Sequence, residues 1–224
     1  MTADDSRFMR LTEQSVSEPF VSQSQANRLS ADTPQAIIAG AISVMAKDGL
    51  PQLTTKRVSE RAAVSTGAIH YFFDTKERLI YESFAAVIRN IRRQFAGARQ
   101  SADPLTRIRA TLDVFFSKAQ VTGDTVKIWP QLWVHAGTDK ATARLFHIYN
   151  ARMISNFTYD LRAAGMPRAM ARSYALRLNA LHRGLWIELH LGGCTDAAET
   201  RDIYTAMMET IIRDIQTCAK GKAA

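Results

Sequence analysis

Cysteine is scarce in this chain. Its 224 residues include only 2 cysteines, Cys194 and Cys218, too few for a disulfide framework or a zinc-binding motif. We therefore expect free thiols and a reducing compartment. The chain also lacks an apolar run of about 18 residues, and its first residues are acidic where a signal peptide would have its apolar core. These absences predict a soluble, cytoplasmic protein with no membrane partner.

Sequence patterns of catalysis are also absent. There is no glycine-rich phosphate loop, no nucleophile elbow and no pair of carboxylates on a recognisable catalytic scaffold. The histidines stand apart: His182 and His190 diverge because their spacing adds about 80° to two full helical turns. We expect such isolated histidines to be exposed or hydrogen-bonded. The sequence predicts no enzyme activity, no cofactor and no metal site.

Strand patterns and hairpin turns are missing as well, while apolar residues recur at helical spacing. The chain is 46% hydrophobic, which is typical of a globular protein. Its beginning, residues 1–31, is rich in serine, glutamine and acids and predicts a mobile arm. The expected fold class is all-α, with about nine helices after that arm.

Two short helical patterns meet at a tight corner in residues 53–73. Thr54 and Ser65 are placed to cap them, because a hydroxyl that accepts a bond from a free helix N–H stabilises the first turn. Only residues 62–64 separate the two patterns, which is too few for anything but a sharp turn. This arrangement predicts a helix-turn-helix.

The second helix of this motif carries side chains suited to DNA. Ser65 and Thr66 are hydroxyl donors at a helix start, where free N–H groups favour an anion such as phosphate. Gly67 would let a partner's backbone approach closely. His70 and Tyr71 are long enough to reach base edges or phosphates in a major groove. The alternative is that Ser-Thr-Gly only caps a helix and the rings fill a core.

The spacing of these residues resembles the DNA-binding domain of the TetR family of transcriptional regulators. The resemblance covers about residues 34–80 and rests on Thr-Thr-x-x-Val-x-x-x-Ala-x-Val-Ser-x-Gly-x-Ile-x-Tyr-x-Phe, followed by Lys-Glu-x-Leu. It implies three helices within residues 32–78, with the third in the major groove. Carried over residue by residue, it implies DNA contacts from Thr54, Lys56, Ser65, Thr66, Gly67, His70, Tyr71 and Lys76, with Lys76 holding a phosphate.

Two positions depart from the family pattern. Ala63 occupies the place of the usual turn glycine, which we expect to alter or strain the turn. His70 replaces the usual tyrosine of the recognition helix and has Tyr71 beside it. The resemblance therefore implies no particular operator sequence.

Positive charge supports an anionic partner only weakly. The formal net charge is +8, but residues 33–100 and residues 101–224 each carry a net +5. Residues 1–32 carry a net −2, which weakens the alternative that arginines of the arm enter a minor groove.

A long helix is predicted from Lys76, with Asp74 or Thr75 as its cap. At ~1.5 Å per residue it would span about 30 to 35 Å and belong both to the DNA-binding part and to the part that follows. Five further helical stripes are predicted. The first runs from Pro104 to Gly123, the second crosses Pro130 with a kink or restart there, and the third ends at Gly165. The last two cover 167–190 and 195–217, the latter with these residues inward: Ile203, Met207, Ile211 and Ile215.

The second half, residues 79–224, resembles more loosely the C-terminal domain of TetR-family proteins, most nearly the BetI-type branch. The likeness lies in Trp-Pro-Gln-Leu-Trp (129–133) and Gly-Leu-Trp (184–186). It implies a ligand-binding and dimerisation domain, whose last two helices form a four-helix bundle with those of a second copy. Small residues would let these helices pack closely: Ala171, Ala175, Ala180 and Gly184.

Aromatic residues of this half form a candidate ligand pocket: Trp129, Trp133, Tyr149, Phe157 and Trp186. The faces of such rings attract quaternary ammonium groups, so the BetI-type resemblance adds a choline-like ligand as one possibility. The alternative is that these rings belong to the core or to a dimer interface.

Together, these patterns predict a ligand-responsive regulator, most often a repressor in this family. It would bind palindromic, double-stranded operator DNA as a homodimer and be released by a small-molecule effector. Two alternatives come from other classes: a small-molecule binding protein whose helix-turn-helix no longer reads DNA, and an all-α enzyme. The sequence specifies neither the operator nor the effector.

Overall fold

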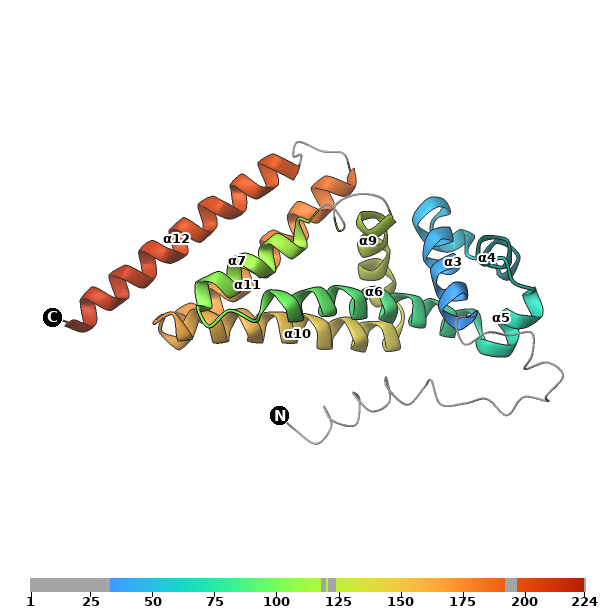
Figure 1. Ribbon diagram of the computed structural model, residues 1–224, viewed down its shortest axis with the longest axis horizontal. Helices are drawn as coiled ribbons and strands as arrows, with labels where there is room; N and C mark the ends of the chain where they lie inside the picture. The colour runs from blue at the N-terminus through green and yellow to red at the C-terminus, as the bar shows by residue number, and fades with distance from the viewer. Residues whose placement is uncertain (1–32, 118–119, 121–123, 192–196, 224) are drawn as a thin grey trace, which may run out of the picture.

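The described part of the chain is entirely helical. The computed structural model describes residues 33–117, 120, 124–191 and 197–223, and within them we find no strand. Nine α-helices and one short 3-10 helix make up these ranges, which confirms the predicted fold class (Figure 1): α3 (Thr33–Asp48), η1 (Leu50–Gln52), α4 (Thr55–Ala62), α5 (Thr66–Phe72), α6 (Lys76–Ala98), α7 (Pro104–Phe115), α9 (Asp124–Ala136), α10 (Lys140–Ala163), α11 (Arg168–Leu191) and α12 (Ala197–Ala223).

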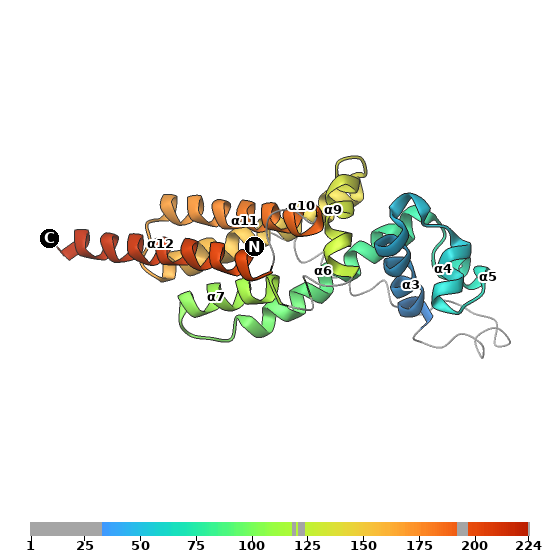
Figure 2. The same cartoon turned by 90° about the horizontal axis from the view of Figure 1, so that it is seen from above.

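The helices form an elongated molecule. Helices α3, α4 and α5 gather at one end, α7, α11 and α12 lie toward the other, and α6 runs between the two ends (Figures 1 and 2). With 23 residues, α6 is about 35 Å long. Helix α9 stands between the three-helix end and the rest, and it packs against α3, α10 and α11.

The corner between α4 and α5 has the local chemistry that the sequence predicts. The Thr54 hydroxyl accepts a hydrogen bond from the backbone N–H of Arg57, and the Ser65 hydroxyl accepts one from Ala68. Between the two helices, Ala63 adopts a left-handed conformation with φ 53° and ψ 41°. This is the backbone region that favours glycine, so the missing turn glycine leaves strain at this residue.

A glycine lets α3 and α4 approach each other. A Cβ placed on Gly40 would lie 3.0 Å from the Cβ of Ala62 and 3.2 Å from the carbonyl oxygen of Val58. Any larger residue at position 40 would therefore push the two helices apart. Ala62, the last residue of α4, therefore packs against α3.

The core follows one face of α6 into the larger half of the molecule. Five side chains of this face are buried: Ile80, Phe84, Ile88, Ile91 and Phe95. At the far end, the fully buried Asp160 of α10 accepts hydrogen bonds from Arg99 at 2.6 and 3.2 Å and from Arg107 at 2.8 Å. These two ion pairs connect the end of α6 and the start of α7 to the end of α10.

Three helices differ from the sequence prediction. Helix α7 ends at Phe115, well before Gly123. Helix α9 continues through Pro130 without restarting. On α12 the buried apolar residues are Tyr204, Met208 and Ile211, whereas Ile203 is exposed and Met207 only partly buried. This helix has apolar residues on two neighbouring stripes, and spacing alone does not tell which stripe faces the chain's own core.

Several predicted features fall outside the described residues: the arm 1–31, Gly123 and Cys194. Within the described ranges, no helix combines the length and apolar character that a membrane crossing requires. The same ranges hold no group of three or more histidine, cysteine or acidic residues arranged to bind a metal.

Candidate DNA-binding surface and aromatic cluster

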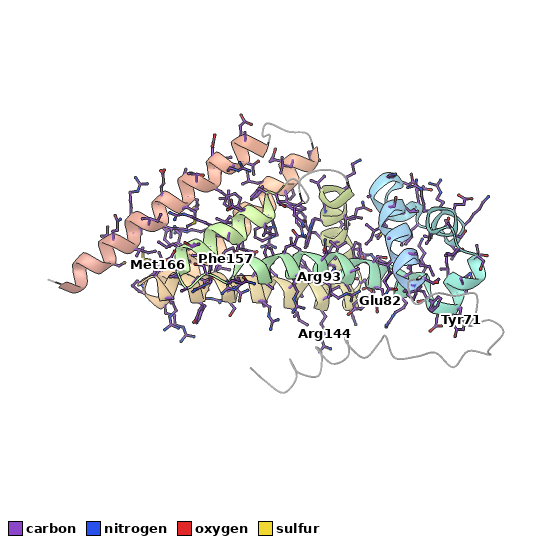
Figure 3. All side chains as sticks on the ribbon, viewed as in Figure 1. Tyr71, Glu82, Arg93, Arg144, Phe157 and Met166 are labelled. Carbon is purple, nitrogen blue, oxygen red and sulfur yellow. The ribbon has the colours of Figure 1, made fainter. Side chains whose placement is uncertain are left out.

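All eight residues predicted to contact DNA are exposed on the three-helix end of the molecule: Thr54, Lys56, Ser65, Thr66, Gly67, His70, Tyr71 and Lys76. They come from the start of α4, from α5 and its cap, and from the first residue of α6. Tyr71 lies at the outer edge of this end (Figure 3). Its ring leans edge-on against Phe72 at 5.0 Å. The alternative in which both His70 and Tyr71 fill a core is therefore wrong.

Two of these residues are poorly explained by folding alone. Lys76 opens α6, where the positive end of the helix dipole disfavours a cation. Among the described residues it forms no ion pair. Gly67 has a helical backbone, and a Cβ placed there would meet only the Ser65 hydroxyl oxygen, at 3.8 Å. An alanine at this position would therefore fit the fold and favour the helix.

Other basic residues near this surface are held in place. Arg57 forms an ion pair with Asp48 at 3.0 Å, and Arg61 contacts the same carboxylate at 3.6 Å. Arg61 also donates to the Ser43 hydroxyl at 2.9 Å. These contacts neutralise part of the local charge and fix α4 against the end of α3.

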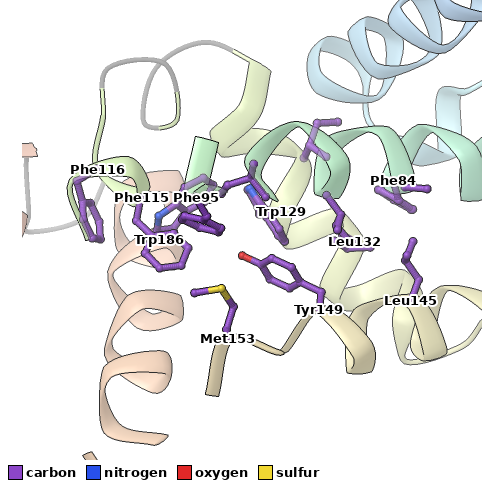
Figure 4. Packing of buried hydrophobic residues seen from close by; sticks show 14 of the residues in the cluster. Phe84, Phe95, Phe115, Phe116, Trp129, Leu132, Leu145, Tyr149, Met153 and Trp186 are labelled. Carbon is purple, nitrogen blue, oxygen red and sulfur yellow. The ribbon is translucent and has the colours of Figure 1, made fainter. Parts of the chain in front are cut away.

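In the larger half, four of the five predicted pocket residues come together. The ring of Trp129 lies 5.3 Å from Tyr149, 5.7 Å from Trp186 and 6.4 Å from Trp133. The hydroxyl end of Tyr149 points toward Trp186 and Met153 (Figure 4). Phe157 is buried too, but it lies two turns beyond Tyr149 on α10, about 12 Å along the helix axis.

Further rings extend this cluster, and the sequence analysis did not assign them to a pocket. His182 stacks on Phe115 at 3.6 Å and lies 5.5 Å from Trp186. Phe116 lies 4.6 Å from Tyr204. We call the full set the aromatic cluster; its members come from α7 and its C-cap, α9, α10, α11 and α12: Phe115, Phe116, Trp129, Trp133, Tyr149, His182, Trp186 and Tyr204.

Polar atoms inside the aromatic cluster lack partners. Five buried groups have no hydrogen-bond partner among the described residues: Trp129 Nε1, Trp186 Nε1, His182 Nδ1, and the hydroxyls of Tyr149 and Tyr204. An unpaired buried donor costs about 1 to 3 kcal/mol. A cluster of five such groups in one place is typical of a site that binds water or a ligand.

Burial sets the protonation states of the cluster. It lowers the pKa of His182 to about 3, with the positive charge of Arg183 as a smaller cause, so the imidazole is neutral near pH 7. Burial raises the pKa of Tyr149, against a small opposing effect of Arg183. It also raises the pKa of Tyr204, to which Tyr149 adds. All three side chains are therefore uncharged at neutral pH.

Comparison with known proteins assigns both halves. Residues 37–82 match the model of the tetR family of bacterial regulatory proteins, and residues 104–213 match the C-terminal model of BetI-type transcriptional repressors. The transcriptional regulator BetI of Burkholderia ambifaria is 34% identical over 147 residues, which cover 65% of this chain and 75% of that protein. The chain belongs to the TetR family of transcriptional regulators. Its C-terminal part is of the BetI type.

Solved structures share the fold of this family member. A transcriptional regulator from Pseudomonas aeruginosa superposes with a TM-score of 0.72 at 22% identity, over 84% of this chain and 94% of the other. One from Saccharomonospora viridis, in complex with choline, superposes with a TM-score of 0.69 at 21% identity, over 80% and 97% of the two chains.

One residue of the BetI-type segment joins the two halves of the molecule. The Gln131 side chain accepts a hydrogen bond from the N–H of Leu50 at 2.7 Å and donates to the carbonyl of Met45 at 2.9 Å. It also donates to Lys127 within α9 at 2.8 Å. Sequence reasoning missed this role, since nothing local to Gln131 indicates a partner more than 80 residues away.

Proposed function

We propose that this TetR-family regulator is a repressor that binds palindromic operator DNA as a homodimer and is released by a small-molecule effector. The observation that carries the DNA-binding part is the exposed surface of α4, α5 and the start of α6. Lys76 stands against the dipole of its own helix, and Gly67 leaves open space that the fold does not need. Both features become favourable when a phosphate backbone lies against them.

The proposed dimer rests on an apolar stripe of α11. Leu176, Ile187 and Leu191 are 44%, 41% and 71% exposed, and with Ala180 and Gly184 they recur every three or four residues on one side of the helix. Such a stripe on a single chain favours contact with a second copy. Of the four small residues expected to allow close packing, Ala171 and Ala175 are buried inside the protomer, and Ala180 and Gly184 are exposed.

The proposed effector site is the aromatic cluster. A ligand there would contact α9, whose Gln131 holds the end of α3, and would also lie against the face of α6 that carries Phe95. Binding that favours one position of α9 and α6 would change the separation of the two recognition helices in a dimer. A coupling of about 1 to 3 kcal/mol is ordinary for such a switch.

Selection of bound sequences from random duplex DNA, followed by footprinting of the selected site, tests this proposal. We expect a palindrome with half-sites about one helical turn apart. Variants of His70 or Tyr71 should change the selected bases, since these side chains are the ones expected to reach base edges. If refolded, ligand-free protein enriches no sequence, the chain is instead a small-molecule binding protein with a non-functional helix-turn-helix.

A further inference from the structure

The polar atoms of the aromatic cluster define what a ligand must carry. Trp129 and Trp186 each present an indole N–H, which donates and never accepts. Tyr149 and Tyr204 add two hydroxyls, and His182 adds a ring nitrogen. Every one of these side chains is at least nine-tenths buried. The two indoles can only donate, so a ligand that pairs with them must carry acceptor atoms.

The charge around the cluster points the same way. Among the described residues, Arg183 is the charged side chain that shifts the pKa of both Tyr149 and His182, and no acidic side chain of these ranges does so. Arg183 hydrogen-bonds only weakly within its own helix, to the Asn179 carbonyl at 3.4 Å. The positive charge of Arg183, which follows His182 on α11, therefore favours an anionic group over a cation near these two rings.

From these two observations, which rest on the effector site of the proposed function, we infer that the effector is a small organic carboxylate with a compact apolar body. Its oxygens accept hydrogen bonds from the indoles and tyrosines, and Arg183 balances its charge. Its apolar body lies against Phe115, Phe116 and Met153. Choline offers the rings a cation but brings only one hydroxyl to the unpaired donors, so it satisfies the site less well.

Four probes of nearly the same shape distinguish recognition of a carboxylate from recognition of a quaternary ammonium group. Choline and trimethylglycine share a trimethylammonium body. The other two probes carry an uncharged tert-butyl group in its place. Within each pair, one compound ends in a hydroxyl and the other in a carboxylate. We expect calorimetric titration of the intact protein to give binding by both carboxylates, each roughly tenfold or more tighter than the matching alcohol. Equal affinities within the pairs, binding by choline alone, or binding by none of the four contradicts the inference.

Matched variants locate the contacts. Tyr149→Phe should weaken both carboxylates about tenfold, while Tyr159→Phe, which changes an exposed tyrosine outside the cluster, should not. Arg183→Gln should weaken the carboxylates and leave the alcohols unchanged. Arg177→Gln is its control, because Arg177 lies over the ring of Tyr174 instead. If Arg183→Gln weakens all four probes alike, the charge argument is wrong.

Operator release is measured separately, so that the two proposals fail independently. Carboxylates that bind but do not release DNA would contradict the ligand response of the proposed function, while the preference of the aromatic cluster for carboxylates would stand. Release of DNA by choline, without binding of the carboxylates, would contradict this inference and leave the ligand response of the proposed function standing.

Discussion

Ala63 shows how a single residue departs from what its backbone needs. Its φ of 53° lies in the left-handed region, where an L side chain crowds the following carbonyl. The corner between α4 and α5 keeps this conformation because the caps at Thr54 and Ser65 and the packing of Val58 and Ile69 fix both helices. The sequence predicted strain here, and the backbone confirms it.

Replacing this residue should stabilise the protein. We expect Ala63→Gly to raise the free energy of unfolding by about 1 kcal/mol, since glycine adopts the left-handed conformation without crowding and Ala63 is exposed. Denaturant unfolding measures the change. The control is Ala62→Gly, which should destabilise, because Ala62 is helical and packs against α3. A loss of stability in Ala63→Gly would show that the turn is not strained.

His182 makes stability depend on pH. Isolated histidines were expected to be exposed or hydrogen-bonded, yet this one is buried, and its Nδ1 has no partner within the described ranges. Its pKa is about 3 in the folded protein, against the ordinary histidine value of 6.5 that applies to the unfolded chain. The unfolded state therefore binds more protons between these values, so stability is complete above about pH 6.5 and falls as the pH drops.

This dependence is measurable with one substitution. Between pH 7 and pH 5, His182 alone should lower the free energy of unfolding by about 2 kcal/mol. His182→Gln should remove that part of the loss, whereas His70→Gln, at an exposed site, should leave it in place. Thermal or denaturant melts at the two pH values give the comparison. Identical pH profiles for wild type and His182→Gln would refute the assignment.

At the scale of elements, α9 contacts both functional regions. Trp129 and Gln131 are two residues apart, about 200° around the helix, so they face opposite sides. Trp129 lies in the aromatic cluster, and Gln131 holds the carbonyl of Met45 and the N–H of Leu50 at the end of α3. Movement of α9 at one site would therefore displace its contacts at the other.

The bond from α9 to α3 can be removed directly. Gln131→Ala should lower the free energy of unfolding by about 1 to 3 kcal/mol, because it leaves partly buried backbone groups of Met45 and Leu50 without this partner. Tryptophan fluorescence during denaturation reports the change. Val134→Ala on the same helix is the control, since Val134 is 76% exposed. Equal stability of the two variants would mean that Gln131 contributes no net binding between the halves.

Helices could be predicted because their boundaries depend on residues close by in the sequence. The caps at Thr54, Ser65 and Thr75 and the stop at Gly165, with φ 104°, each depend on a few neighbouring residues. The exposure of the residues predicted to contact DNA could be foreseen for the same reason. Spacing within a short motif determines which side chains share a helix face.

Contacts between distant segments could not be predicted. The closeness of Gly40 to Ala62 and the bonds of Gln131 join residues that only the tertiary structure brings together. The same holds for the aromatic cluster: its tryptophans were identified, but Tyr204 and His182 have ordinary helical spacing and no local sign of a polar, buried environment. Phe157 was included because it continues the Tyr149 stripe, which extends past the cluster.

At the scale of the whole molecule, α6 runs between the three-helix end, where we propose that DNA binds, and the larger half, where we propose that the effector binds (Figure 1). One recognition helix would read too few base pairs for a genomic search, which favours the proposed dimer. The exposed stripe of α11 is the surface that we expect to join two copies.

A charge on this stripe should separate them. Leu176→Glu should convert a dimer into a monomer, because two carboxylates would be buried against an apolar surface. Analytical ultracentrifugation gives the mass, and circular dichroism checks that the helices remain. Val134→Glu, on the exposed side of α9, should stay dimeric. A dimeric Leu176→Glu variant would exclude this face of α11 as the interface.

The most direct test of DNA binding by the three-helix end is operator affinity measured at several salt concentrations. The measurement compares wild type, Lys76→Ala and Lys140→Ala. Both lysines are exposed and open a helix, but Lys140 begins α10 in the other half of the molecule. If Lys76 holds a phosphate, its removal should weaken binding to all sequences alike and reduce the salt slope by about one per bound subunit, while Lys140→Ala leaves the slope unchanged. Equal slopes for all three proteins would contradict the assigned DNA-binding surface.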